Sequence, residues 1–170
     1  MTYSKIYLKP GKEESLQRFH PWVFSGAIQR FEKQPEEGDI VEVTDNKGNF
    51  IALGHYQIGS IAVRVLSFEP ITIDLDFFKN RLMTAYELRK SIGLTDGDYN
   101  NTFRLVHGEG DNLPGLIIDI YDQTAVMQAH SPGMHYARHI LADAIIQVLG
   151  NHIKNVYYKS ETTLPYKAQL

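Results

Sequence analysis

The spacing of apolar residues changes near Pro70, and this change constrains the fold more than any other feature of the chain. Before Pro70, short runs such as Ile61–Leu66 alternate apolar and polar residues in the manner of half-buried strands, with Gly- and Asn-containing turns between them. After Pro70, apolar residues recur at helical spacing from Phe78 to Ile92. The sequence therefore predicts an α+β fold, in which a small β-barrel over residues 1–70 precedes a small α/β domain over residues 71–170.

The second domain is predicted to contain a helix, β-hairpin strands, a second helix and a last strand. Asp74 is suited to cap the first helix, and Gly93 is suited to end it. We expect strands at 103–106, 116–121, 124–129 and 155–159, a helix from Ser131-Pro132 to Gly150, and a polar loop at 94–102. The polar tail at 160–170 adds no closing element, which suggests a chain cut at a domain boundary.

The composition limits the chemistry of this 170-residue chain. It contains no cysteine, which excludes disulfides and thiolate metal sites. No apolar run has the length that a membrane span requires, so we expect a soluble, cytoplasmic protein without a membrane partner. The formal net charge of −3 argues against a generic nucleic-acid coat protein, because such a protein binds by neutralising phosphates.

Basic residues are nevertheless concentrated at the N-terminus, where residues 1–30 hold five Lys or Arg against two Glu. The candidate RNA-binding residues of this basic edge are Lys9, Lys12, Arg18, His20 and Arg30. For each of them, an ordinary solvated surface residue is the alternative. A position beside a base is the functional alternative for Trp22, but we interpret Trp22 and Phe24 as core residues.

Two carboxylates lie in a Gly-rich turn, Glu109 and Asp111. Acid–base work or a hard metal ion is one interpretation of this pair. The interpretation we favour is structural: carboxylates in such turns accept backbone N–H groups, and one of them is expected to pair with Arg104. Asp119 alternates with its apolar neighbours and is expected to face away from them, toward a partner domain.

Two further patterns suggest sites but are interpreted as structural. His130, His135 and His139 resemble a metal cluster, yet Tyr136 stands where a zinc helix would carry glutamate, so solvent-facing histidines are expected. Gly108 and Gly110 are spaced like the start of a dinucleotide-binding loop, but a second turn and a strand follow them instead of a helix.

Three strings, at 20–28, 52–68 and 109–121, together resemble one family. It comprises S-adenosylmethionine-dependent methyltransferases that modify cytosine carbon 5 in large-subunit ribosomal RNA, and its members carry a PUA domain, a linking domain and a methyltransferase domain. The resemblance covers nearly the whole chain but only the first two of these parts. Asn112 and Ile120 depart from the family pattern, which commonly has glycine and arginine there, and the second departure removes a positive charge.

The resemblance implies a PUA-like RNA-binding domain over residues 1–70 and a linking domain over residues 71–170. The implied partners are structured ribosomal RNA and a missing catalytic domain, which would bind S-adenosylmethionine. In such enzymes a cysteine thiolate adds to carbon 6 of the cytosine, and a chain without cysteine cannot do so. We therefore predict a non-catalytic, substrate-orienting portion, with no catalytic, cofactor or metal residue in this chain.

Two alternatives stay open. The chain is a stand-alone PUA-type module that binds RNA or protein, or a metal-dependent hydrolase built on Glu109, Asp111 and the histidines. A homodimer is compatible with each of these interpretations.

Overall fold

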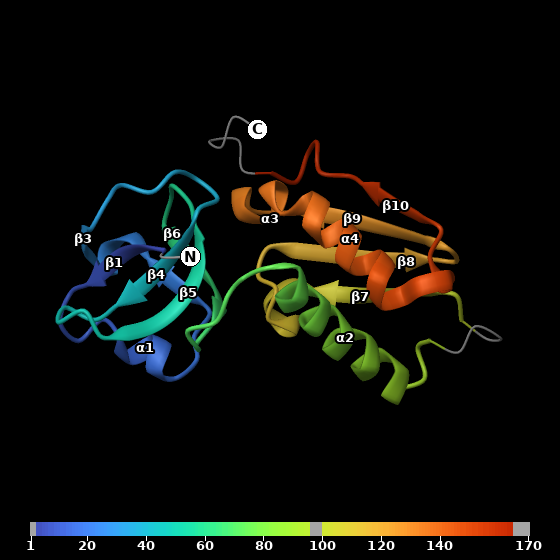
Figure 1. The fold of residues 1–170 in the computed structure, drawn as a ribbon, viewed down its shortest axis with the longest axis horizontal. Helices are drawn as coiled ribbons and strands as arrows, with labels where there is room; N and C mark the ends of the chain where they lie inside the picture. The colour runs from blue at the N-terminus through green and yellow to red at the C-terminus, as the bar shows by residue number, and fades with distance from the viewer. Residues whose placement is uncertain (1–2, 96–99, 165–170) are drawn as a thin grey trace. The chain divides into compact units, whose positions relative to one another are not determined.

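The computed structural model describes residues 3–95 and 100–164, in which strands and helices divide between two compact units (Figure 1). The first unit runs to Thr72 and takes in Ser131–Gly133, and we call it the barrel unit. The second comprises Ile73–His130 and Met134–Leu164, and we call it the linking unit. Of the predicted loop and tail, residues 96–99 and 165–170 lie outside the described residues.

The barrel unit is built from short strands and helical turns that follow the predicted alternation closely. Its elements are β1 (Ser4–Leu8), α1 (Glu14–Gln17), β2 (Trp22–Phe24), η1 (Ser25–Ala27), β3 (Ile28–Phe31), β4 (Ile40–Thr44), β5 (Phe50–Tyr56) and β6 (Ile61–Ser67). Within the described residues the strands form one curled sheet in the order β2-β6-β5-β4-β1-β3, antiparallel except for the β1–β4 pair.

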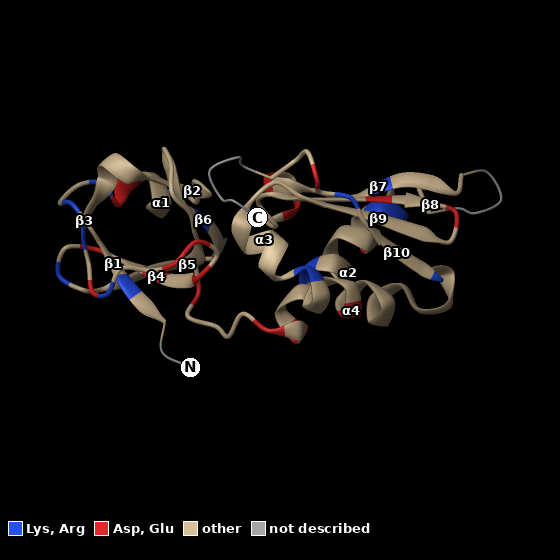
Figure 2. Ribbon diagram, turned by 90° about the horizontal axis from the view of Figure 1, so that it is seen from above, with Lys and Arg blue, Asp and Glu red and all other residues tan. Residues whose placement is uncertain are grey.

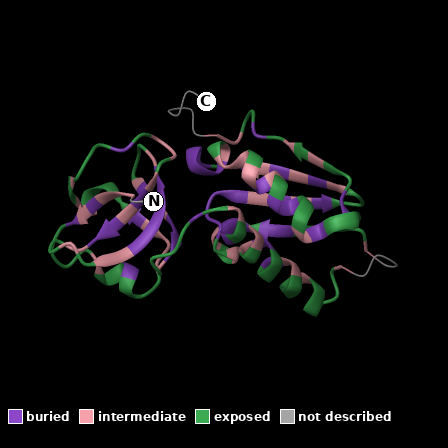
Figure 3. Cartoon of the chain, viewed as in Figure 1, coloured by how far each residue is buried: buried purple, intermediate pink, exposed green. Residues whose placement is uncertain are grey.

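Alternation places the apolar side of these strands inside the curl, where the buried residues gather (Figure 3). The core comprises Ile6, Leu8, Leu16, Val23, Val41, Val43, Ala52, Tyr56, Ala62, Val63 and Val65. Gly54 lets β5 and β6 approach closely, because a Cβ atom there would lie 2.4 Å from the Arg64 carbonyl oxygen.

The part of the chain after Thr72 carries the longer helices. The elements are α2 (Leu75–Ser91), β7 (Thr102–His107), η2 (Gly108–Asp111), β8 (Leu116–Tyr121), β9 (Thr124–Ala129), α3 (Pro132–Tyr136), α4 (Arg138–Leu149), η3 (Gly150–His152) and β10 (Asn155–Tyr158). Their sheet has the order β10-β9-β8-β7, with β10 parallel to β9 and the other pairs antiparallel. The expected α+β fold is confirmed.

Helices α2 and α4 lie on one face of this sheet (Figures 1 and 2). Their buried residues Leu82, Leu141 and Ile145 supply one side of the core, and Ile118 and Met127 of the sheet supply the other. Asp74 caps α2 as predicted, since its Oδ1 accepts a hydrogen bond of 3.0 Å from the Phe77 N–H. In the described residues no helix is long and apolar enough to span a membrane.

The structure corrects one predicted element. The single helix expected from Ser131 to Gly150 is two helices, α3 and α4, because Ala137 adopts φ −76° and ψ −1° between them. Gly150 ends α4 as predicted, with a φ of +54° that favours glycine.

Candidate nucleic-acid interface

A cavity of about 330 Å³ lies in the barrel unit between α1 and the β2–η1 segment. The buried side chain of Leu16 anchors α1, a single helical turn, to the barrel core. Lys12 and Ser15 line the cavity on this side, and Trp22, Phe24 and Gly26 line the other. The cavity thus combines one cation, one hydroxyl and two aromatic rings.

The Trp22 and Phe24 rings line this cavity, and the His20 ring contacts both of them. The His20 ring meets the Trp22 ring edge-on, with 5.7 Å between centroids, and lies 6.1 Å from the Phe24 ring. His20 Nδ1 accepts a hydrogen bond of 3.3 Å from the Trp22 backbone N–H. His20 is therefore tied to β2, and its ring supports the wall.

The core interpretation of Phe24 is wrong, because half of Phe24 is exposed. Trp22 is half-buried. Strand β2 is a short edge strand, paired only with β6 in the described sheet. The Phe24 ring meets the His20 and Trp22 rings there and stays half-exposed. Exposed aromatic rings at a basic edge are the surface that unpaired bases stack on.

Lys9 and Arg18 differ in whether another group of the chain already binds their charged ends. The Lys9 ammonium group donates a hydrogen bond of 2.8 Å to the Gly26 carbonyl, which holds η1 at the cavity wall. Arg18 lies on the solvent side of α1, with its side chain 81% exposed and only a 3.8 Å approach to Glu14. Such an exposed pair contributes little to stability, so the Arg18 guanidinium is available to a ligand.

Arg30 does not join this cluster. Its guanidinium lies 3.4 Å from the centre of the Tyr7 ring, across the β1–β3 pair. It borders another cavity of the barrel unit, of about 370 Å³, together with Phe31 and Tyr56. The structure therefore places Lys12 in the cavity wall and Lys9 and His20 against residues of that wall. Arg18 lies at the C-terminal end of α1, and Arg30 borders a different cavity. Figure 2 shows basic and acidic segments interspersed over this unit.

Sequence reasoning missed Phe19, which is 72% exposed and adopts φ +62° next to His20. A positive φ is uncommon outside glycine, so this residue marks a sharp bend between α1 and β2. The Phe19 ring still meets Phe68 edge-on, with 5.2 Å between centroids. The signal available in the sequence was an aromatic residue directly before the His-Pro pair.

Of the two carboxylates of the Gly-rich turn, Asp111 is structural, as favoured, but the partner expected for the turn was wrong. Asp111 pairs with Arg89 of α2 through two contacts, one of them 2.8 Å between Nη2 and Oδ2, and it accepts a hydrogen bond of 2.6 Å from the His107 N–H. Arg104 instead pairs with Asp119 across β7 and β8, at 2.8 Å. This pairing raises the pKa of Arg104, chiefly through the hydrogen bond.

The histidines do not converge on one point. No group of three or more His, Cys, Asp or Glu in the described residues is placed to hold a metal ion. His135 is half-buried, not solvent-facing as expected, and its Nδ1 lies 2.7 Å from the Tyr158 hydroxyl. Partial burial, and secondarily the charge of Arg138, lowers the pKa of His135.

The Gly-rich turn at Gly108 and Gly110 lacks the arrangement of a class I S-adenosylmethionine site. A class I donor site needs a Gly-rich turn between a strand and the N-terminus of a helix. Gly108 and Gly110 lie in η2 between two strands, and the carboxylate of Asp111 beside them is already paired. No step of methyl transfer is therefore assigned to these residues.

Comparison with known proteins gives these units a context. Residues 6–68 match the PUA-like domain family. The chain is 39% identical over 143 residues to proteins named ribosomal RNA large subunit methyltransferase I from Escherichia coli (strain SMS-3-5 / SECEC) and Shigella boydii serotype 4 (strain Sb227). These alignments cover 83% of this chain and 36% of each relative, so the chain spans about a third of their length.

A solved structure described as "a putative sam-dependent methyltransferase from Streptococcus mutans" has the same fold over most of the chain. Its TM-score is 0.78 at 17% identity, and the match covers 94% of this chain and 41% of that one. The barrel unit is thus PUA-like, and the chain is similar to one portion of ribosomal RNA methyltransferases.

Proposed function

We propose that this chain is the RNA-recognising and substrate-orienting portion of a ribosomal RNA methyltransferase, and that the portion of the relatives it does not match carries the methyl transfer. The observation that carries the proposal is the basic edge of the PUA-like barrel unit. There Lys12 lines a cavity walled by half-exposed aromatic rings, and the exposed Arg18 follows α1, whose Ser15 and Leu16 also line that cavity.

The contacts of each residue in the basic edge indicate which role it would have in RNA binding. Lys12 and Arg18 would meet phosphates, since no close ion pair in the described residues occupies either charge. Lys9 and His20 would hold the wall in place through their contacts with Gly26 and Trp22. Arg30, stacked on Tyr7 at a different edge, would serve as a second phosphate contact only for an RNA that extends beyond the cavity.

The proposal includes the modified atom, carbon 5 of a cytosine, on the sequence resemblance described above. S-adenosylmethionine and the cysteine nucleophile would both belong to the catalytic portion, because the chain has no cysteine and its Gly-rich turn does not suit the donor. Structured ribosomal RNA and that catalytic portion are the proposed partners. A cytoplasmic location is part of the proposal, since the relatives act, by name, on ribosomal RNA.

The test is the salt dependence of RNA binding. Fluorescence anisotropy would follow a labelled hairpin from large-subunit ribosomal RNA between 50 and 200 mM salt, conditions under which phosphate contacts dominate affinity. We expect Lys12→Glu together with Arg18→Glu to weaken binding and to reduce the slope of log affinity against log salt by about 2.

The matched control is Lys33→Glu together with Lys47→Glu, which changes the charge of the same unit equally at exposed positions away from the cavity. If both pairs weaken binding alike, the basic edge is not a site. If wild-type chain does not bind the hairpin, the alternative of a protein-interaction module gains support, in line with the net charge of −3.

A further inference from the structure

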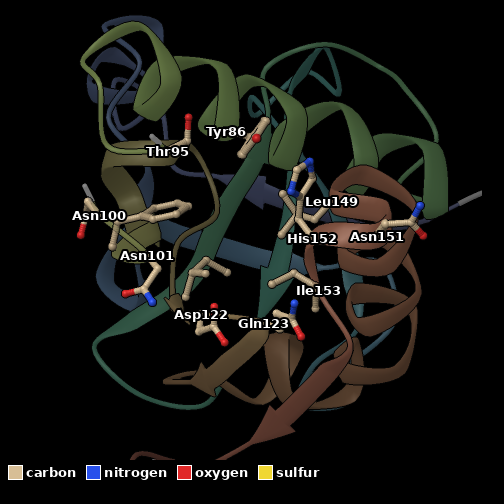
Figure 4. A pocket seen from close by; sticks show the side chains of 12 residues that line it. Tyr86, Thr95, Asn100, Asn101, Asp122, Gln123, Leu149, Asn151, His152 and Ile153 are labelled. Atoms are coloured by element: carbon tan, nitrogen blue, oxygen red, sulfur yellow. The ribbon is translucent and has the colours of Figure 1, made fainter. Parts of the chain in front are cut away.

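A second cavity, of about 260 Å³, opens in the linking unit where four segments of the chain meet (Figure 4). Tyr86 comes from α2, Phe103 from β7, Gln123 from the turn between β8 and β9, and Asn151 from η3 after α4. All four belong to the linking unit. The basic edge of the barrel unit shares no residue with it.

The chemistry of the wall is apolar at its base and amide-rich at its rim. Ile120, Leu149 and Ile153 are buried and line the base. Tyr86 and Phe103 are half-buried and add two aromatic rings. The rim carries Asn101, Asp122, Gln123 and Asn151, all exposed, and the described residues that line the cavity include no Lys, Arg or Glu.

The rim is held in place before any ligand arrives. The Asp122 N–H donates to the Asn101 carbonyl at 2.7 Å, and the Gln123 carbonyl accepts from the N–H groups of Lys154 and Asn155 at 2.8 and 3.2 Å. A hairpin turn is usually free at its tip, but this one is bonded to the chain on both sides. Among the described residues, the side-chain amides of Gln123 and Asn151 meet no hydrogen-bond partner, so both are available.

Size and charge define what such a cavity takes. Its volume lies below the roughly 300–1,000 Å³ of pockets for drug-sized ligands, so it suits a single ring system. The described wall has no Lys or Arg, and His152 is its one side chain that can carry a positive charge, so a phosphate would not be favoured. Amide groups present a donor and an acceptor side by side, which matches the edge of a nucleobase, and aromatic rings stack on its face.

We propose that this cavity binds an uncharged nucleobase, supplied by an unpaired nucleotide of the RNA that the barrel unit binds. This inference rests on the proposed function for its source of the base. Gln123 and Asn151 would bond to the base edge, Asp122 would accept from an exocyclic amino group, and Tyr86 or Phe103 would contact the base face.

The experiment titrates the full ¹⁵N-labelled chain with adenosine, guanosine, cytidine and uridine, none of which carries phosphate. We expect amide shifts confined to residues around the cavity, with at least one nucleoside preferred. Gln123→Ala together with Asn151→Ala should raise the dissociation constant about tenfold, as the loss of two hydrogen bonds implies. Gln128→Ala is the matched control, since Gln128 lies on β9 outside the cavity wall.

A second arm measures the affinity of the same variants for a single-stranded RNA containing the preferred base and for the same RNA with an abasic site. Loss of affinity in the double variant only for the intact RNA supports the inference. Nucleoside shifts without any effect on RNA would overturn RNA as the source. Absent shifts, or shifts unchanged in the double variant, would overturn the site itself, while RNA binding through Lys12 and Arg18 would still stand.

Discussion

At the scale of single residues, His55 predicts how stability depends on pH. It is 4% exposed on β5, and burial lowers its pKa from 6.5 to about 4. The unfolded chain binds the proton of this histidine more readily than the folded chain does. The contribution of neutral His55 to the free energy of unfolding is therefore fully present above pH 6.5 and is lost as the pH falls toward 4. The full loss is on the order of 3 kcal/mol. Urea unfolding followed by Trp22 fluorescence at successive pH values measures it.

The matched variant is His55→Leu, which replaces the titrating imidazole by an apolar side chain of similar size. The free energy of unfolding of the wild type should fall relative to that of the variant by somewhat more than 1 kcal/mol per pH unit between pH 6 and pH 4.5. Parallel curves for the two proteins would show that His55 does not titrate in this way.

The role of a single residue could be predicted from the sequence where its residue type has one main physical reason to stand at that position. Asp74 was assigned as a helix cap because its carboxylate accepts a backbone N–H, and it does so. Asn112 departs from an expected glycine, and its φ of +55° explains why: asparagine is among the few other residues that adopt this conformation. The prediction for Phe24 is wrong because aromatic residues are usually buried, whereas Phe24 lies half-exposed at the end of edge strand β2, where the register shifts.

At the scale of elements, the ion pair between Arg89 and Asp111 links α2 to η2. The two side chains are 11% and 4% exposed, and Arg89 also donates a hydrogen bond of 3.0 Å to the Arg104 carbonyl. We expect Arg89→Met to destabilise the chain by about 3 kcal/mol, because it leaves the Asp111 carboxylate buried without its cation. Thermal unfolding followed by circular dichroism at 222 nm checks this.

Arg104→Met is the comparison, since it removes the other Arg–Asp pair of the same unit. Arg104 is 45% exposed, so its loss should cost less than about 1 kcal/mol. Equal losses for the two variants would mean that burial of the Arg89 pair does not matter. The variant Arg89→Met with Asp111→Asn should recover part of the lost stability, because it removes the unpaired charge.

The same pair shows where element-scale prediction from sequence stops. The bounds of β8 and β9 were predicted from alternation and turn residues, which are local signals. The partner of Asp111 lies 22 residues away on a helix, and strand spacing pointed to Arg104 instead. The cavity of the linking unit was not predicted at all, because its wall comes from four segments that only the tertiary fold brings together.

At the scale of the whole molecule, each of the two units has its own core, and the chain passes from the barrel unit to the linking unit after Thr72. The barrel core gathers around Val43, and the linking core contains Leu141. Domains with separate cores can unfold in separate cooperative transitions, and we expect this of the two units. The chain offers a probe for each: its single Trp, Trp22, lies in the barrel unit, and the longer helices α2 and α4 lie in the linking unit.

We therefore predict that Leu141→Ala lowers the urea midpoint seen by circular dichroism at 222 nm and leaves the midpoint seen by Trp22 fluorescence in place. The expected loss is about 3 kcal/mol, since Leu141 is fully buried. Val43→Ala, also fully buried, should do the reverse at a smaller cost. If either substitution shifts both probes equally, the two cores unfold as one, and the RNA-binding and base-binding roles proposed for the separate units would have to be tested as a single coupled function.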